Sequence, residues 1–165
     1  MTAELTCDPF AALNEALCHE EEARQFYIKA AERTADRSGA QMFRDLANTA
    51  STHIAILEQQ VESLSNQDRW ILPECALGCE ADLTDPFFPR GYEALKEAIR
   101  SNADDNDAII FALERVQKGH AMYREAALSA LDPIARRIYE YLTEEAKTQR
   151  DLLMLSFERV APYPA

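Results

Sequence analysis

Apolar side chains recur at steps of three and four residues in the first part of the chain, the period of one face of an α-helix. One such run covers about residues 8–36, and a second covers about residues 38–65, with Ser38 as a candidate cap between them. The inner positions of the two runs include Leu13, Ala16, Leu17, Ala23, Tyr27, Met42, Phe43, Leu46, Ala50 and Leu57. The pattern therefore predicts a helical hairpin over about residues 8–65.

The same period returns near the end of the chain, after a stretch that lacks it. Residues 66–91 contain Pro73, Pro86 and Pro89 and show no steady period, which predicts a long connection. Residues 92–100 predict a short extra helix. Two longer helices follow within about residues 104–160, divided where Pro133 marks a helix start, so a second hairpin is expected there.

The two hairpins repeat each other. Residues 12–64 align without a gap with residues 108–160, at an offset of 108 − 12 = 96. Equivalent positions carry the same apolar residue in pairs such as Tyr27 and Tyr123, Leu46 and Leu142, Ala50 and Ala146, and Leu57 and Leu153. The long connection allows the third helix to begin at the far end of the second. The sequence predicts one all-α domain over residues 1–165, a four-helix bundle with a single crossover.

Two segments of the first hairpin carry a family resemblance. The first reads ALCHEEEARQFY and places Tyr27 seven residues after Glu20, while the second reads MFRDLA and is followed by His53. These residues resemble the rubrerythrin-like branch of the ferritin-like proteins, over about residues 10–64 and 92–160. The resemblance implies a ferritin-like bundle, and it implies a diiron oxidoreductase that acts on peroxide or oxygen.

The iron ligands of such a bundle are a Glu from each of two helices and a Glu-x-x-His from each of the other two. The resemblance places these ligands at Glu20, at Ala50 with His53, at Val116, and at Ala146 with Gln149. Alanine and valine have no donor atom, and an amide replaces an imidazole poorly as a ligand. We therefore expect no diiron cluster.

Neighbouring carboxylates do not repair the ligand set. Glu114, Glu144 and Glu145 lie one or two positions away from the ligand register. Each residue turns an α-helix by about 100°, so these side chains are expected on other sides of their helices.

A smaller metal site is one interpretation of what is left. His120 lies four residues after Val116, and His53 lies on a helix that runs in the same direction. With Glu20 they would form a two-histidine, one-carboxylate set that suits one iron or zinc ion. The alternative is a metal-free network in which a buried Glu20 accepts hydrogen bonds from a tyrosine or a histidine.

Charge, hydropathy and cysteine content limit the possible partners and the expected compartment of the protein. The chain has 29 acidic and 17 basic side chains, a formal charge of −12, which disfavours nucleic acids and anionic membranes as partners. No run of about 18 apolar residues and no basic leader precedes the first helix, so we expect a cytoplasmic protein. The scattered Cys7, Cys18, Cys75 and Cys79 are expected as reduced thiols, and His19 is expected on a solvated helix face.

Two classes of function stay open at this point. The first is a metal-dependent oxidoreductase that uses Glu20, His53 and His120. The second is a non-catalytic bundle that acts as a structural or partner-binding protein, with the partner unidentified. Aromatic residues outside the inner rows, namely Trp70, Phe87 and Phe88, favour a homodimer.

Overall fold

The computed structural model describes residues 8–88 and the backbone of residues 103–160, with side chains for residues 107–157. It contains four long helices, α1 (Pro9–Arg33), α2 (Arg37–Gln67), α4 (Ala103–Ser129) and α5 (Pro133–Val160), and a short 3-10 helix, η2 (Glu74–Ala76). The described part of the chain has no β-strand. The short helix expected over residues 92–100 lies outside the described residues.

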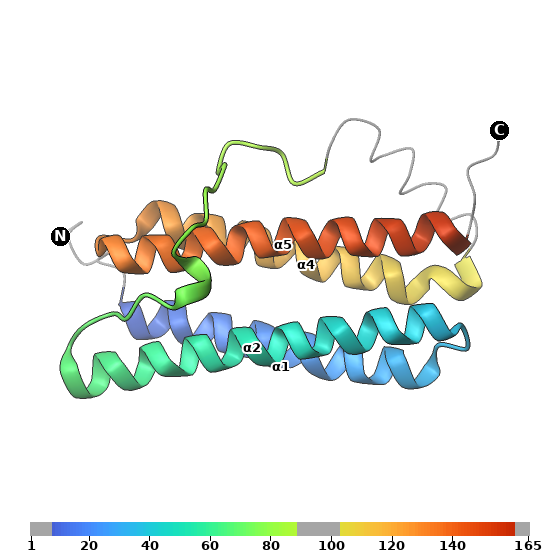
Figure 1. Ribbon diagram of the computed structural model, residues 1–165, viewed down its shortest axis with the longest axis horizontal. Helices are drawn as coiled ribbons and strands as arrows, with labels where there is room; N and C mark the ends of the chain where they lie inside the picture. Colours follow the sequence, from blue (N-terminus) through green and yellow to red (C-terminus); the bar gives the residue numbers. More distant parts are fainter. Residues whose placement is uncertain (1–7, 89–102, 161–165) are drawn as a thin grey trace.

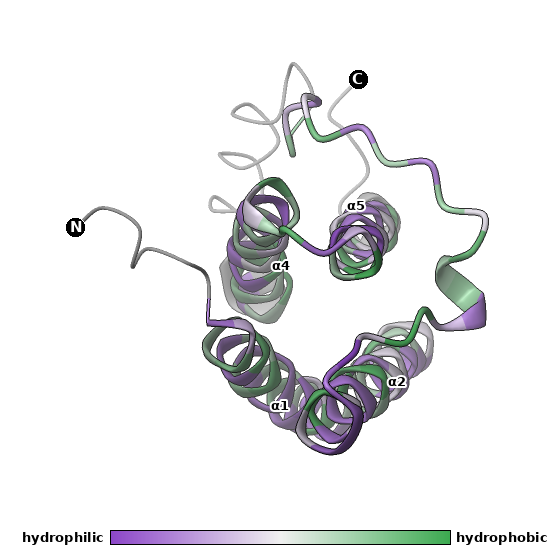
Figure 2. Cartoon of the chain, turned by 90° about the vertical axis from the view of Figure 1, so that its left-hand side faces the viewer, coloured by the Kyte–Doolittle hydropathy of each residue, from purple (hydrophilic) through white to green (hydrophobic). Residues whose placement is uncertain are grey.

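The helices form two antiparallel hairpins, α1 with α2 and α4 with α5 (Figure 1). Seen along the bundle, α1 lies beside α4 and α2 lies beside α5 (Figure 2). Although α2 and α4 are consecutive long helices in the described part of the chain, both begin at the same end of the bundle and run in the same direction (Figure 1). This confirms the prediction of an all-α four-helix bundle with one crossover. No helix in the described ranges has an apolar stretch long enough to cross a membrane.

Aspartates fix the beginnings of three helices. The carboxylate of Asp8 accepts a hydrogen bond from the backbone N–H two residues later (3.0 Å), and Asp132 caps α5 in the same way (2.8 Å). Asp36 accepts from the N–H of Gly39 (2.7 Å) and so caps α2. Ser38, the cap expected from the sequence, lies inside the first turn of α2 instead, because α2 begins at Arg37 and Asp36 takes the cap position.

Several inward-facing positions that are equivalent in the two hairpins are buried to a similar degree. The exposed fractions are 2% for Leu46 and 1% for Leu142, and 0% for both Leu57 and Leu153. The pair Tyr27 and Tyr123 is likewise buried, at 2% and 3%. The repeat in the sequence is therefore a repeat of inward-facing rows, and the core of the bundle is built from both hairpins.

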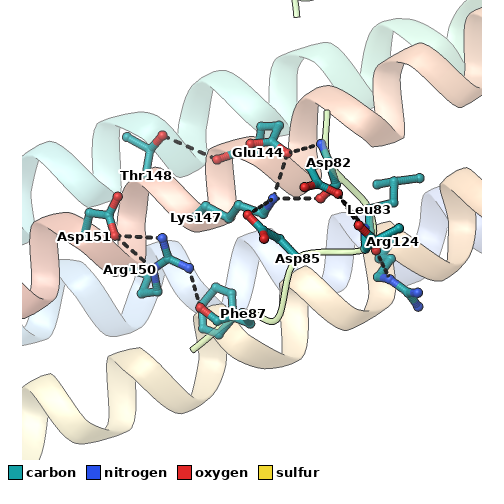
Figure 3. A network of polar contacts seen from close by, with 11 residues as sticks. Asp82, Leu83, Asp85, Phe87, Arg124, Glu144, Lys147, Thr148, Arg150 and Asp151 are labelled. Carbon is teal, nitrogen blue, oxygen red and sulfur yellow. Dashed lines mark hydrogen bonds and ion pairs between the residues drawn. The ribbon is translucent and has the colours of Figure 1, made fainter. Parts of the chain in front are cut away.

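Hydrogen bonds attach the described part of the crossover after α2 to the bundle near both of its ends. Gln60 of α2 pairs with the backbone of Ile71, donating to its carbonyl (2.7 Å) and accepting from its N–H (2.9 Å). Farther along, four basic side chains of α4 and α5 donate to backbone carbonyls of the crossover. They are Arg137 to Leu77 (2.8 Å), Lys147 to Asp82 (2.7 Å), Arg124 to Leu83 (2.5 Å), and Arg150 to Phe87. Figure 3 shows the last three of these contacts.

Candidate functional site

A buried carboxylate lies at the centre of the bundle. Glu20 is only 5% exposed because it continues the inward row of α1 that contains Ala16, Ala23 and Tyr27. Its Oε1 atom lies 3.3 Å from Nδ1 of His53, which is itself 1% exposed, on α2. The structure thus brings together two of the three predicted metal-site residues.

The second hairpin supplies a further donor to the same oxygen. The hydroxyl of Tyr123, on α4, donates to Oε1 of Glu20 at 2.5 Å. Burial is the largest influence on the pKa of Glu20 and raises it, but the hydrogen bonds from His53 and Tyr123 are among the influences that outweigh it. The pKa of Glu20 therefore ends below its usual value. Burial and the Glu20 charge raise the pKa of Tyr123, so the hydroxyl keeps its proton.

Three of the four remaining positions of the implied diiron set line one small cavity beside Glu20 and His53, and Ala50 is the position that does not. Val116 on α4 and Ala146 and Gln149 on α5 contribute to its wall. The register carried over from the sequence therefore gathers these side chains in one place. The cavity leaves about 10 Å³ for the centre of a water-sized molecule, which is room for roughly one water.

His19 also lines this cavity, although the sequence suggested a solvated position. Its ring lies across Gly119 of α4 and meets the ring of Tyr123 edge-on, with 6.2 Å between centroids. A Cβ atom at Gly119 would come within 2.6 Å of Nε2 of His19, so this close approach requires glycine. Burial lowers the pKa of His19 more than the charge of Glu20 raises it. The glycine was a signal for this contact, because glycine inside a helix needs a packing reason.

Arg115 on α4 is a second lining residue that the sequence did not single out. One of its terminal nitrogens donates to Glu22 of α1 at 3.2 Å, and its guanidinium lies 5.5 Å from the ring centroid of Phe111. These contacts place the inner part of the Arg115 side chain against the cavity and its charge near the surface.

His120 is buried, at 5% exposed, but it lies elsewhere. Its ring packs on Phe87 of the crossover, with 4.9 Å between centroids, and it lines a different cavity from Glu20 and His53. Burial lowers the pKa of His120, and the charges of Lys147 and Arg124 lower it further. The described residues contain no group of three or more His, Cys, Asp and Glu side chains able to hold a metal ion. Metal binding by Glu20, His53 and His120 stays a prediction.

The off-register carboxylates have partners of their own. Glu144 accepts from the backbone N–H of Asp82 and from Lys147, each at 2.9 Å, and Glu145 accepts from the hydroxyl of Tyr141 at 2.5 Å. Neither lines the cavity beside Glu20. The contacts of Glu144 attach the crossover to α5, and the contact of Glu145 lies within α5.

The described cysteines are free thiols. Cys18 and Cys75 are exposed, and Cys79 is half-buried. Burial raises the pKa of Cys79, and the carboxylates of Glu144 and Glu140 raise it further, so this thiol stays protonated near neutral pH.

Two of the three aromatic residues that suggested a homodimer are covered within the chain. Trp70 is 9% exposed and Phe87 is 8% exposed, and Phe88 packs partly buried beside the core. Their burial removes the reason given for a dimer. The homodimer itself stays a prediction.

Comparisons with known proteins establish the fold. No protein-family model matches this chain, and no curated protein matches it. Among solved structures, the chain is similar to a two-domain protein from Anabaena variabilis that contains DJ-1/ThiJ/PfpI-like and ferritin-like domains. The TM-score is 0.67 at 21% sequence identity, and the match covers 97% of this chain and 41% of that chain. The fold of this chain is ferritin-like, and the chain spans less than half the length of that protein.

Proposed function

We propose that this chain is a non-catalytic ferritin-like bundle whose central carboxylate is held in a metal-free hydrogen-bonded network. The proposal rests on one observation, which is that Tyr123 and His53 both form hydrogen bonds with Oε1 of Glu20. A buried carboxylate needs compensation for lost hydration, and two donors supply it without a cation. A metal ion would have to displace these hydrogen bonds to reach the same oxygen.

The second hairpin supports the same conclusion. Val116 and Ala146 present only hydrocarbon to the cavity, and Gln149 presents a neutral amide. The resemblance to rubrerythrins requires anionic or imidazole ligands at these positions. The wall therefore fits a packed core better than a redox centre that binds two ions.

A partner-binding or structural role follows from this proposal. The similar Anabaena variabilis protein joins its ferritin-like domain to a DJ-1/ThiJ/PfpI-like domain within one chain. We propose that this bundle likewise associates with another protein or domain. Its role would be that of a stable structural unit and not that of a catalyst.

A single iron or zinc ion is the second candidate, and one observation favours it. The Nε2 atom of His53 is buried without a hydrogen-bond partner in the described part of the chain, and His53 lines the cavity next to Glu20. An imidazole nitrogen of this kind is a good ligand for either metal. In this candidate His120 would have to leave Phe87 to join the site.

Metal analysis separates the two candidates. The protein is expressed with added iron and zinc, freed of loosely bound metal, and analysed for metal content and for peroxide consumption, with His53→Ala as the matched variant. We expect far less than one ion per chain and the same peroxide consumption in both proteins.

A stoichiometric ion that is lost in His53→Ala, or an affinity that falls at least tenfold in that variant, would support the single-ion site and overturn the metal-free proposal. An ion held equally by both proteins would also contradict it, because the metal would then occupy another site, such as Cys75 with Cys79.

A further inference from the structure

Two buried polar atoms belong to side chains that line the cavity beside Glu20. They are Nε2 of His53, on α2, and Nε of Arg115, on α4, and both side chains contribute to the wall. Neither atom has a hydrogen-bond partner among the described residues. Buried polar atoms in folded proteins nearly always have a partner, and ordered water supplies it where side chains do not.

The chemistry of the two atoms is complementary. Oε1 of Glu20 accepts a hydrogen bond from the hydroxyl of Tyr123, and with this oxygen as the acceptor the contact with His53 places a proton on Nδ1 of the imidazole. In the neutral ring the proton on Nδ1 leaves a lone pair on Nε2, which accepts. The Nε atom of Arg115 always carries a proton and only donates. The cavity therefore presents one acceptor and one donor.

We propose that this cavity is a binding site for a single water molecule, which accepts a hydrogen bond from Nε of Arg115 and donates one to Nε2 of His53. The space agrees, because about 10 Å³ is open to the centre of a water-sized molecule and a single water needs roughly 10–15 Å³. The inference rests on the proposed function, since a metal ion at Nε2 would use the same lone pair.

The water completes a chain of contacts from the core to the surface. Tyr123 donates to Glu20, His53 donates to Glu20, and the water joins His53 to Arg115. Arg115 then donates to the exposed Glu22 on α1 at 3.2 Å. The site links α1, α2 and α4 at one level of the bundle, where α5 contributes mainly apolar wall.

A larger ligand does not fit this description. Val116 and Leu142 close the apolar side of the cavity, and the ring of His19 lies across Gly119 on the α1 side. Gln149 of α5 also lines the space and offers an amide as a third partner for a water. Water is therefore the ligand chemistry that the size and the donor pattern select.

Crystal structures at high resolution test the site in three proteins: the unaltered chain, Arg115→Met and Glu22→Gln. Arg115→Met removes the donor and keeps an unbranched side chain whose terminal methyl group takes the place of Nε. Glu22→Gln alters the surface contact of Arg115 and leaves Nε in place, so it is the matched control. We expect one density peak within about 2.7–3.2 Å of both nitrogens in the unaltered chain and in Glu22→Gln, and its loss in Arg115→Met.

Other outcomes overturn the proposal in distinguishable ways. An empty cavity, a peak that touches only one nitrogen, or an unmoved peak in Arg115→Met contradicts the water site and leaves the metal-free function intact. A peak with the anomalous scattering of iron or zinc contradicts both. If a variant does not crystallise, oxygen-17 relaxation dispersion in solution can count its long-lived bound water molecules instead. Arg115→Met must then show one long-lived water fewer than Glu22→Gln, and an equal number in the two variants contradicts the site.

Discussion

The two hairpins bury equivalent rows of side chains but differ where they meet the central cavity. The α1–α2 hairpin presents Glu20 and His53, and the equivalent positions of the α4–α5 hairpin are Val116 and Gln149. At these two positions the first hairpin carries a carboxylate and an imidazole, and the second carries an aliphatic side chain and a neutral amide. The comparison shows that packing of the bundle depends on rows shared by both hairpins, whereas the buried carboxylate and its histidine are residues that only the first hairpin keeps.

The carboxylate of the first hairpin nevertheless has a partner in the second. Tyr123 supplies the shorter of the two hydrogen bonds to Glu20, at 2.5 Å against 3.3 Å for His53. The equivalent Tyr27 stacks on Phe43 of α2 just as Tyr123 stacks on Tyr139 of α5, but of the two tyrosines it is Tyr123 that donates to Glu20. Residues at these equivalent positions thus share burial and ring packing but differ in their hydrogen bonds.

The largest effect is expected from making the two hairpins alike at the cavity. Val116→Glu places a second carboxylate beside the ionised Glu20, in a space that holds about one water. A buried charge without a partner costs about 3 to 5 kcal/mol, so the free energy of unfolding should fall by that amount in metal-free buffer. Chemical denaturation measures it.

Metal addition sharpens the same experiment. The new carboxylate would complete a set with Glu20 and His53, so zinc or ferrous ions should restore part of the lost stability in Val116→Glu and leave the unaltered chain unchanged. Val116→Gln, of the same size but uncharged, is the control and should not respond to metal. An unaltered stability in Val116→Glu would show that this position does not face Glu20.

Truncation of the shared rows tests the similarity of the hairpins. Leu46→Ala and Leu142→Ala remove equivalent buried side chains, and each should lower the free energy of unfolding by roughly 2 to 5 kcal/mol. Thermal or urea denaturation measures both under the same conditions. If one substitution leaves the free energy of unfolding unchanged, Leu46 and Leu142 do not play equivalent parts in the core.

The fold could be predicted from the sequence because its signals are local and repeated. The three- and four-residue period marks the helices, and the repeat that pairs Leu46 with Leu142 shows that both hairpins bury the same rows. The length of the connection then selects the single-crossover arrangement. Burial at equivalent positions confirms this part of the sequence analysis.

The candidate site could be predicted only in part, because helical register gives the direction of a side chain but not its partner. Glu20 and His53 were placed inward, and they do meet. His120 is also buried, but the crossover places Phe87 against it, and no periodic signal marks where an irregular segment packs. The contact of His19 with Gly119 depends on the spacing between α1 and α4, which the sequence does not encode locally.

The paired tyrosines offer a finer test of the difference between the hairpins. Tyr123→Phe removes a donor to an ionised, buried carboxylate and should cost about 1.5 to 3 kcal/mol. Tyr27→Phe at the equivalent position keeps both hydrogen bonds of Glu20 and should cost less. Equilibrium denaturation of the two variants gives the difference directly, and equal losses would mean that the hydrogen bond to Glu20 contributes nothing of its own.

The smallest effect concerns the buried histidines, one in each hairpin. His53 lies beside a carboxylate, whereas His120 lies among the cations Lys147, Arg124 and Arg150, with Glu144 as the opposing charge. Burial and these cations hold the pKa of His120 below its usual value near 6.5. The unfolded chain therefore takes up a proton at a higher pH than the folded chain does. Stability from this group is present above about pH 6.5 and is lost as the pH falls below it.

His120→Gln isolates that contribution, because the amide does not titrate. The free energy of unfolding, measured by urea denaturation between pH 7.5 and 5, should fall less steeply in His120→Gln than in the unaltered chain. The slope should not vanish, since burial also depresses the pKa of His19, which the variant keeps. Identical slopes would mean that His120 takes up its proton as readily in the folded chain as in the unfolded one, so that Phe87 and the surrounding cations do not oppose its charge.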